Sequence, residues 1–185
     1  MSQGKNEVWE WIKALIIAVL LAGSIRYFLF APIVVDGESM MPTLQDHYRM
    51  IVNKIGYKIG KPERFDIVVF HATEERDYIK RVIGLPGDHV EYKDDVLYIN
   101  GKPIEEPYLE QYKREVNGPL TNDFTLEEVT GVDRVPDGQL FVLGDNRRFS
   151  KDSRIIGTVS MDKVLGKTNI VYWPPSEFKI MSDKQ

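Results

Sequence analysis

The feature that most constrains this chain is one long apolar run near its N-terminus, from Trp11 to Phe30. Residues 14–22 show no polar face, unlike the amphipathic helices that cover soluble domains. At about 1.5 Å per residue, a helix of about 20 residues spans about 30 Å, the thickness of the hydrocarbon layer of a membrane. We therefore expect residues 11–31 to form one transmembrane anchor, in preference to a buried helix or a cleaved signal peptide.

Charged and aromatic residues flank this run as membrane interfaces favour. Lys13 and Arg26 lie near its two ends, from which long cationic side chains can reach the lipid headgroups. Aromatic residues before and after the run lie where an interfacial belt is expected. We expect residues 1–10 to be a cytoplasmic tail and residues 32–185 to form an extracytoplasmic domain, tethered to the lipid of the cell membrane by a single pass.

The composition excludes several classes of protein. The 28 acidic residues outnumber the 24 basic ones, giving a formal net charge of −4, whereas a nucleic-acid-binding protein is normally basic. The chain has no cysteine, which excludes disulfides, a thiol nucleophile and metal sites built on thiolates. It also lacks the sequence motifs of zinc proteases and of nucleotide-binding loops, so we expect neither a metal nor a cofactor.

Beyond the apolar run, short segments rich in valine, isoleucine and tyrosine alternate with turn signals. This pattern is typical of β-strands, and residues 93–95 and Asn100-Gly101 favour tight hairpin turns. We expect a mainly β domain of largely antiparallel, irregular curled sheets or a sandwich. The expected strands are 33–35, 49–53, 66–70, 78–83, 89–92, 96–99, 139–143 and 168–173.

Residues 105–135 depart from the strand pattern. The segment is charged, contains Gly118-Pro119 and lacks a strand period, although residues 126–129 favour a helical turn. We interpret it as a surface extension of the β domain rather than as a second domain.

A first candidate for chemistry lies between Asp36 and Leu44. Gly37 permits a tight turn, and Pro42 fixes the direction in which the chain leaves it. A serine held in such a turn, with its own N–H exposed, can act as a nucleophile beside an oxyanion donor. Ser39 is therefore a candidate nucleophile, and the alternative is an ordinary turn with an exposed serine.

A second candidate is Lys80, within the expected strand 78–83. Its apolar neighbours Ile79, Val82 and Ile83 would desolvate the amine, which lowers the pKa of a lysine and favours the neutral form that can act as a base. The alternative is an edge-strand lysine that discourages aggregation. The three histidines are scattered and adjoin no serine or carboxylate motif, so a histidine-based triad has no support.

A third segment, from Gly144 to Arg154, follows the expected strand 139–143. It is dense in hydrogen-bonding side chains, which can brace a site through ion pairs and capped turns. The alternative is a polar surface loop.

Together the three segments resemble the bacterial type I signal peptidases, or leader peptidases, of the Gram-positive branch. The resemblance rests on residues 39–42, on residues 80–88, and on residues 144–147 with 152–154, in this order and after an N-terminal anchor. It implies a largely antiparallel β fold and a membrane-bound serine endopeptidase with a Ser/Lys dyad. Such an enzyme would cleave N-terminal signal peptides from secretory preproteins after small residues of the Ala-x-Ala type, through an acyl-enzyme.

The resemblance also implies roles for individual residues. Ser39 would be the nucleophile, Lys80 the general base, and the Ser150 hydroxyl would help to orient the lysine. The structural supports would be Arg81, Asp145, Asp152 and Arg154. For the walls of the substrate pocket we select Ile33, Val34, Val35 and Met40.

Two positions differ from the family pattern. Gly37 stands where some members have a serine that donates to the oxyanion, so the oxyanion hole would depend on the Ser39 N–H and an unidentified second donor or water. Phe65 stands where glycine is usual, which concerns a local turn rather than catalysis.

Two other functions stay open. A Ser/Lys self-cleaving repressor-type protease would need an N-terminal DNA-binding domain in place of the short apolar segment. A catalytically inactive, membrane-anchored β module that binds precursors would not need to retain both Ser39 and Lys80.

Overall fold

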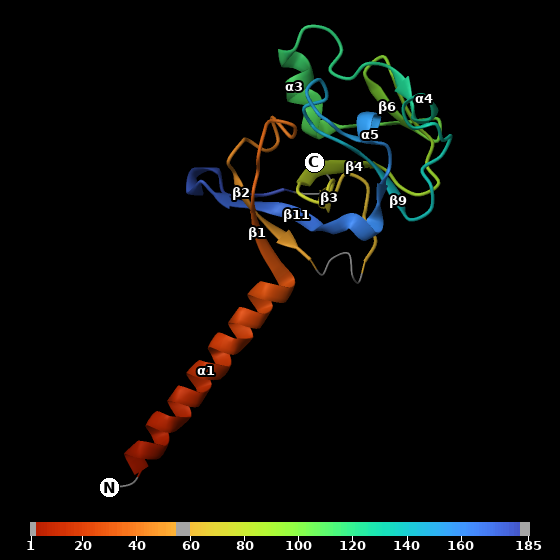
Figure 1. Ribbon diagram of the computed structural model, residues 1–185. Coiled ribbons are helices and arrows are strands. Elements are labelled where there is room, and N and C mark those ends of the chain that lie inside the picture. The colour runs from red at the N-terminus through yellow and green to blue at the C-terminus, as the bar shows by residue number, and fades with distance from the viewer. Residues whose placement is uncertain (1–2, 55–59, 182–185) are drawn as a thin grey trace.

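The computed structural model describes residues 3–54 and 60–181, with the backbone alone described for residues 3–6 and 24–29. Helix α1 (Gln3–Leu29) projects from the β domain as a single long rod (Figure 1), and its described side chains at 7–23 are all exposed. In the described residues, no helix combines the length and the apolar character required of a membrane span. The anchor expected at 11–31 is therefore not confirmed, and the Arg26 side chain lies outside the described residues. Phe30 and Ala31 belong to the first strand rather than to the helix.

The main sheet contains eight strands in the order β1-β2-β11-β3-β4-β9-β10, with β12 paired to β11. All of these neighbours are antiparallel, as predicted. Lys80 pairs with Val68 of β3, whereas β9 pairs with β4 only from Arg81 onward. Because Lys80 is 3% exposed, it is not the solvent-facing lysine that the edge-strand alternative requires. The strands are β1 (Phe30–Val34), β2 (Arg49–Asn53), β3 (Ile67–His71), β4 (Asp77–Gly84), β9 (Gln139–Leu143), β10 (Val159–Ser160), β11 (Val164–Trp173) and β12 (Lys179–Ile180).

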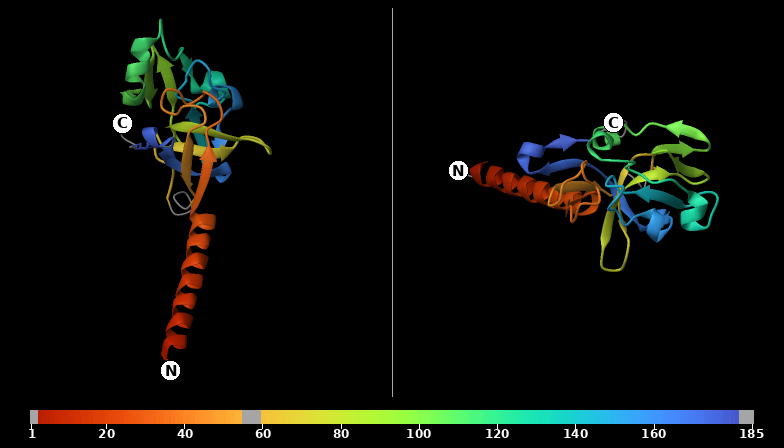
Figure 2. Two further views of the ribbon diagram at one scale, coloured as in Figure 1. Left: turned by 90° about the vertical axis from the view of Figure 1, so that its left-hand side faces the viewer. Right: turned by 90° about the horizontal axis from the view of Figure 1, so that it is seen from above.

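A second, four-stranded antiparallel sheet lies at the end of the domain that is remote from α1 (Figure 2). Its order is β7-β6-β5-β8. Tight hairpin turns were predicted at both connections, between β5 and β6 and between β6 and β7. Asp94 and Asp95 in the first, and Asn100 and Gly101 in the second, all have positive φ, the conformation of the central residues of a type I′ turn. The strands are β5 (Val90–Lys93), β6 (Val96–Ile99), β7 (Lys102–Ile104) and β8 (Phe124–Thr125).

Short helices fill the connections. Helix α4 forms where a helical turn was predicted, and a capping box between Thr125 and Glu128 fixes its start. The segment 105–135 also contributes β8 and buries several of its own side chains, a point that matters for the site below. The helices are η1 (Pro107–Leu109), α3 (Glu110–Glu115), α4 (Leu126–Thr130), α5 (Ser153–Ile156), η2 (Met161–Lys163) and η3 (Pro175–Glu177).

Three apolar clusters form the core. One joins the second sheet to β4 and β9 and includes Leu97 and Phe141, and another packs on the main sheet around Val68 and Val142. The third contains Met40, Leu44, Met50 and Val171, so it holds the chain between β1 and β2 against the sheet. The turn that carries Ser39 is therefore anchored from below by buried side chains.

Candidate active site

A compact turn between β1 and β2 presents Ser39. Gly37 has a φ of +91°, a left-handed conformation that favours glycine, and its N–H donates to Asp46 Oδ1 at 2.8 Å. Met40 is 1% exposed and Leu44 is fully buried, so the chain that follows the serine is anchored in the core. Within the described residues the Ser39 N–H donates no hydrogen bond to the backbone. The turn therefore offers a hydroxyl and a backbone donor side by side.

Lys80 reaches this serine from β4. Its Nζ lies 2.8 Å from Ser39 Oγ and donates to Ile79 O at 2.9 Å. The residue is only 3% exposed, and burial lowers the pKa of Lys80 to about 8, although the charges of Asp152 and Asp145 act in the opposite direction. Near neutral pH a useful fraction of this lysine is the neutral amine, and its nitrogen is placed to accept the hydroxyl proton.

The histidines serve no similar function. His47, His71 and His89 each lie beside an aspartate, and none of them lines the cleft at Ser39 among the described residues. Among the described residues, Lys80 is therefore the basic side chain that contacts the Ser39 hydroxyl.

Two ion pairs brace the loop that follows β9, residues 144–154. Arg81 donates to both carboxylate oxygens of Asp145 at 2.9 and 2.7 Å, and both side chains are buried. Asp152 caps the start of α5 and accepts from Arg154 at 2.8 Å on each of its oxygens. Breaking one partner of a buried pair leaves an uncompensated charge, so such pairs hold backbone segments in place. The four expected supports thus lie in one region around Lys80.

Gly144 allows this loop to approach the serine turn closely. A Cβ at this position would overlap the Ser39 carbonyl oxygen and the Ser150 side chain, so glycine is required. Asn146 then fastens the two segments together, because its N–H donates to Ser39 O and its side-chain amide donates to Glu38 O, both at 3.1 Å. The sequence motif contained both residues, but their contacts were not predicted.

Ser150 lies beside Gly144, as the close approach of its side chain shows. Its hydroxyl is buried and has no hydrogen-bond partner in the part of the chain that the structure describes. The hydrogen bond to Lys80 that the resemblance implies is therefore not formed in this structure.

A cleft of about 740 Å³ opens at Ser39 and Lys80. One side of it is built by β1, an edge strand of the main sheet, and another by the first half of β4. The four residues selected as pocket walls, Ile33, Val34, Val35 and Met40, all line this cleft, together with Tyr78 and Ile79. Charged side chains, among them Glu38, Asp77 and Lys151, line other parts of the cleft. A cleft beside an unpaired strand edge can accept a peptide in extended conformation.

The structure shows how Phe65, which stands where the family usually has glycine, is accommodated. Its φ is +74°, so it occupies a left-handed position where glycine carries less strain. The phenylalanine is retained in a packed position, since its ring meets Tyr108 edge-on at 5.5 Å and its carbonyl accepts from Arg81 at 3.0 Å. The turn is therefore formed without glycine, as an unusual backbone conformation that packing supports.

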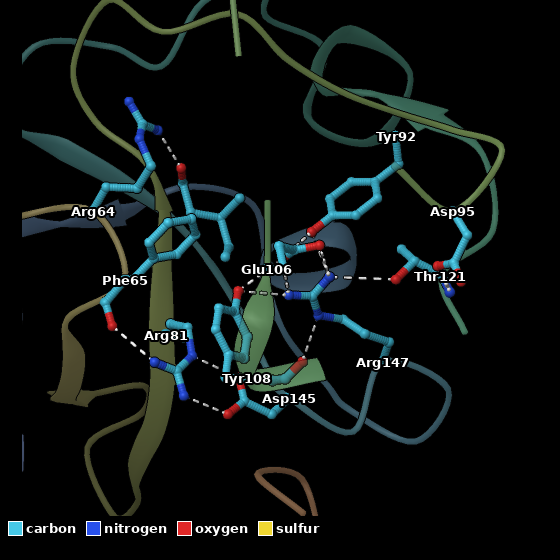
Figure 3. Close-up of polar contacts among 12 residues, drawn as sticks. Arg64, Phe65, Arg81, Tyr92, Asp95, Glu106, Tyr108, Thr121, Asp145 and Arg147 are labelled. Carbon is cyan, nitrogen blue, oxygen red and sulfur yellow. Dashed lines mark hydrogen bonds and ion pairs between the residues drawn. The ribbon is translucent and has the colours of Figure 1, made fainter. Parts of the chain in front are cut away.

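Sequence reasoning missed a buried polar cluster behind the 144–154 loop (Figure 3). Arg147 and Glu106 form an ion pair at 2.6 Å with side chains 0% and 1% exposed, and Tyr92 and Tyr108 donate to the same carboxylate at 2.8 and 2.7 Å. No sequence pattern joins these residues, because they lie on different loops and strands that only the tertiary fold brings together.

The C-terminal segment contributes a second unpredicted contact. Lys179 Nζ donates to Thr43 O at 2.8 Å, and Tyr48 donates to Glu177 at 3.1 Å. Thr43, the acceptor of the first bond, and Tyr48, the donor of the second, both belong to the chain between β1 and β2. The C-terminal segment therefore helps to hold the segment that carries Ser39.

Comparisons with known proteins show which family this sequence resembles. The sequence pattern of the family described as "Signal peptidase, peptidase S26" matches residues 8–173. Signal peptidase I of Bacillus caldolyticus is 53% identical over 171 residues, which cover 92% of each chain, and signal peptidase IB of Staphylococcus aureus (strain COL) is 44% identical over 180 residues, covering 95% of this chain and 94% of that one. The crystal structure of a signal peptidase I from Enterococcus faecalis V583 superposes with a TM-score of 0.56 at 50% identity, covering 58% of this chain and 97% of that one. This chain belongs to the signal peptidase family, peptidase S26.

Proposed function

We propose that this protein is a membrane-bound signal peptidase I that removes signal peptides from secretory preproteins with a Ser39–Lys80 dyad. The single observation that carries the proposal is the 2.8 Å contact between Lys80 Nζ and Ser39 Oγ in a cleft that has apolar side chains beside the serine. A buried lysine beside a serine hydroxyl can activate that hydroxyl as a nucleophile without a catalytic histidine.

The first half of the reaction forms an acyl-enzyme. Neutral Lys80 takes the proton of Ser39 as Oγ attacks the scissile carbonyl carbon, and the carbonyl oxygen becomes an oxyanion. When this intermediate collapses, the C–N bond breaks and the Lys80 ammonium gives its proton to the leaving amine, which is the new N-terminus of the mature protein. The signal peptide then remains on Ser39 as an ester.

The second half returns the enzyme to its starting state. Lys80, neutral again, takes a proton from a water molecule that attacks the ester carbonyl. The ester bond breaks, the proton passes to Ser39 Oγ, and the signal peptide leaves with a free carboxyl group.

The Ser39 N–H supports the oxyanion in this scheme, since it donates no backbone hydrogen bond within the described residues. Gly37 offers no side-chain donor, so a second donor has to come from elsewhere. A single donor in comparable sites contributes about 2.7–4 kcal/mol to transition-state stabilisation, which makes the Ser39 N–H a large term.

Substrate choice follows from the walls of the cleft. An extended precursor segment adding to the free edge of β1 would place alternate side chains toward Val35, Met40 and Ile79. These apolar walls suit methyl-sized side chains at the two positions before the cleaved bond that point inward, which is the Ala-x-Ala pattern.

The N-terminal helix supplies the membrane attachment in this proposal. Its apolar side chains, such as Leu15, Val19 and Leu20, are 62–66% exposed and have no protein partner to cover them. An exposed apolar surface of this size normally marks a contact with lipid or protein. With α1 in the membrane and residues 1–10 in the cytoplasm, the β domain and its cleft would lie at the outer face of the membrane, close to where preproteins emerge.

Cleavage of a defined precursor tests the function. The full-length protein in detergent micelles is expected to cut a precursor with alanine at the two recognition positions directly after the second alanine, as mapped by mass spectrometry. Replacing that alanine by leucine in the precursor is expected to lower kcat/KM by about 10–200-fold, because the larger side chain overlaps the apolar wall. Equal cleavage of both precursors, or cleavage at scattered positions, would contradict the proposed specificity.

A further inference from the structure

Arg147 is the largest fully buried side chain in the described part of the domain, and every nitrogen of its guanidinium is engaged (Figure 3). NH2 meets Glu106 Oε1 at 2.6 Å and Tyr108 OH at 3.2 Å, and NH1 meets Thr121 Oγ1 at 3.3 Å and the hydroxyl of Tyr92. A guanidinium with no access to water needs such a set of acceptors, and Glu106 supplies the only full opposite charge among these partners.

The remaining nitrogen connects this cluster to the active site. Arg147 Nε donates to Gly144 O at 3.0 Å. Gly144 is the residue whose lack of a side chain lets the loop approach Ser39, and Asn146, next to Arg147, donates to Ser39 O. The position of the Arg147 side chain is thus transmitted through two backbone contacts to the nucleophile.

A second connection leads to the base. Tyr108, which donates to Glu106, lies with its ring 3.8 Å from the guanidinium carbon of Arg81. Arg81 follows Lys80 on β4 and holds Asp145 in the same loop. Glu106 therefore contacts both routes, one to Ser39 through Arg147 and one to Lys80 through Tyr108 and Arg81.

Glu106 is charged in this environment. Burial by itself raises the pKa of a carboxyl group, but the charge and hydrogen bonds of Arg147 and the two tyrosine hydroxyls outweigh it, so the pKa of Glu106 lies below its ordinary value. At neutral pH the cluster is an ion pair with two supporting phenols, and it has one preferred geometry because all of its partners are fixed by the fold.

We propose that Glu106 is a positioning residue for catalysis, which acts through Arg147 to hold the 144–154 loop against Ser39 and Lys80. This inference rests on the proposed function. Glu106 belongs to the segment 105–135, which also supplies strand β8 of the second sheet. This segment would therefore help to set the geometry of the active site.

The test substitutes Glu106→Gln in the full-length protein and measures kcat and KM for precursor cleavage. Glutamine keeps the size and one acceptor oxygen but removes the charge that holds Arg147. We expect kcat to fall by about 10–100-fold, the usual effect of disturbing a group that orients a reacting one, while KM stays within about twofold because Glu106 does not line the cleft. Glu105→Gln makes the same chemical change at the exposed neighbouring position and is expected to leave both constants unchanged.

Two further variants separate positioning from loss of stability. Leu97→Ala opens a cavity in the core of the second sheet and is expected to lower Tm while leaving kcat per folded molecule unchanged at temperatures well below Tm. The double variant Glu106→Gln with Arg147→Met removes both charges, which is expected to recover much of the Tm lost in the single variant. The double variant is not expected to recover kcat, because methionine at position 147 cannot donate to Gly144 O as Arg147 Nε does.

The outcomes are distinct. A wild-type kcat in folded Glu106→Gln, or a kcat that returns together with Tm in the double variant, would overturn the positioning role and leave the proposed function intact. A wild-type protein that cleaves no precursor would overturn the proposed function and the positioning role together.

Discussion

Ser39→Ala is expected to reduce precursor cleavage by about 10⁴–10⁶-fold, the range found when the nucleophile or a partner of a serine protease is removed. The acyl-enzyme cannot form without Oγ, and no other hydroxyl lies within hydrogen-bonding distance of Lys80 Nζ among the described residues. The substitution removes one hydrogen bond and leaves the buried anchors Met40 and Leu44 in place, so Tm is expected to change little.

The measurement compares cleavage rates and thermal unfolding of the wild-type and Ser39→Ala proteins at equal concentration in detergent. Cleavage by the folded alanine variant at a rate near that of wild type would remove Ser39 from the mechanism. The same comparison decides the alternative of an inactive precursor-binding module, for which the wild-type protein itself would show no cleavage.

Lys80→Met is expected to lower kcat by at least about 10²–10⁴-fold, the contribution of a positioned general base. Methionine matches the length of the lysine stem but has no basic nitrogen, so the Ser39 proton has no acceptor. Stability is expected to hold or rise, because a residue that is 3% exposed no longer carries an amine that must be desolvated. Loss of cleavage without loss of stability separates the chemical role of the amine from a structural one.

The matched control is Lys102→Met, the same change at an exposed position on β7, for which rate and Tm are expected to stay near the wild-type values. An active Lys80→Met protein would contradict the assignment of the base, and so would a variant whose loss of cleavage merely follows its loss of folded protein.

Much of the fold was accessible from sequence because alternation and turn residues are local signals. Val96–Ile99 and Gln139–Leu143 were predicted with their observed bounds, and the hairpins at Asp94 and Asn100 follow from residues that tolerate positive φ. The strands β7, β8, β10 and β12 were missed, because strands of two or three residues are too short to show an alternation of apolar and polar side chains. Strand β11 begins at Val164, four residues before the predicted start. The prediction missed this part because Gly166 interrupts the alternation of side chains, and a bulge lies at this point.

The site was predicted unevenly for a physical reason. Ser39 and Lys80 were found because each stands in a recognisable local context, and the supports followed from the family motif. Glu106 was missed because a charged residue in a charged segment is normally exposed, whereas here Arg147 compensates its burial from a distant loop. For Ser150 the motif predicted more than the structure shows. The family resemblance implies a contact with Lys80, but the Ser150 hydroxyl has no hydrogen-bond partner among the described residues.

The pH dependence of kcat/KM tests the central claim, catalysis by neutral Lys80, most directly. Because burial lowers the pKa of Lys80 to about 8, the neutral fraction rises with pH through this value and falls about tenfold for each pH unit below it. The account predicts that kcat/KM for precursor cleavage by the wild-type protein, which reports the pKa of the free enzyme, rises between pH 6 and 9 with a midpoint near 8 and reaches a plateau above it. A midpoint near 6.5, the ordinary range of histidine, or a rate that does not change between pH 6 and 10, would contradict it.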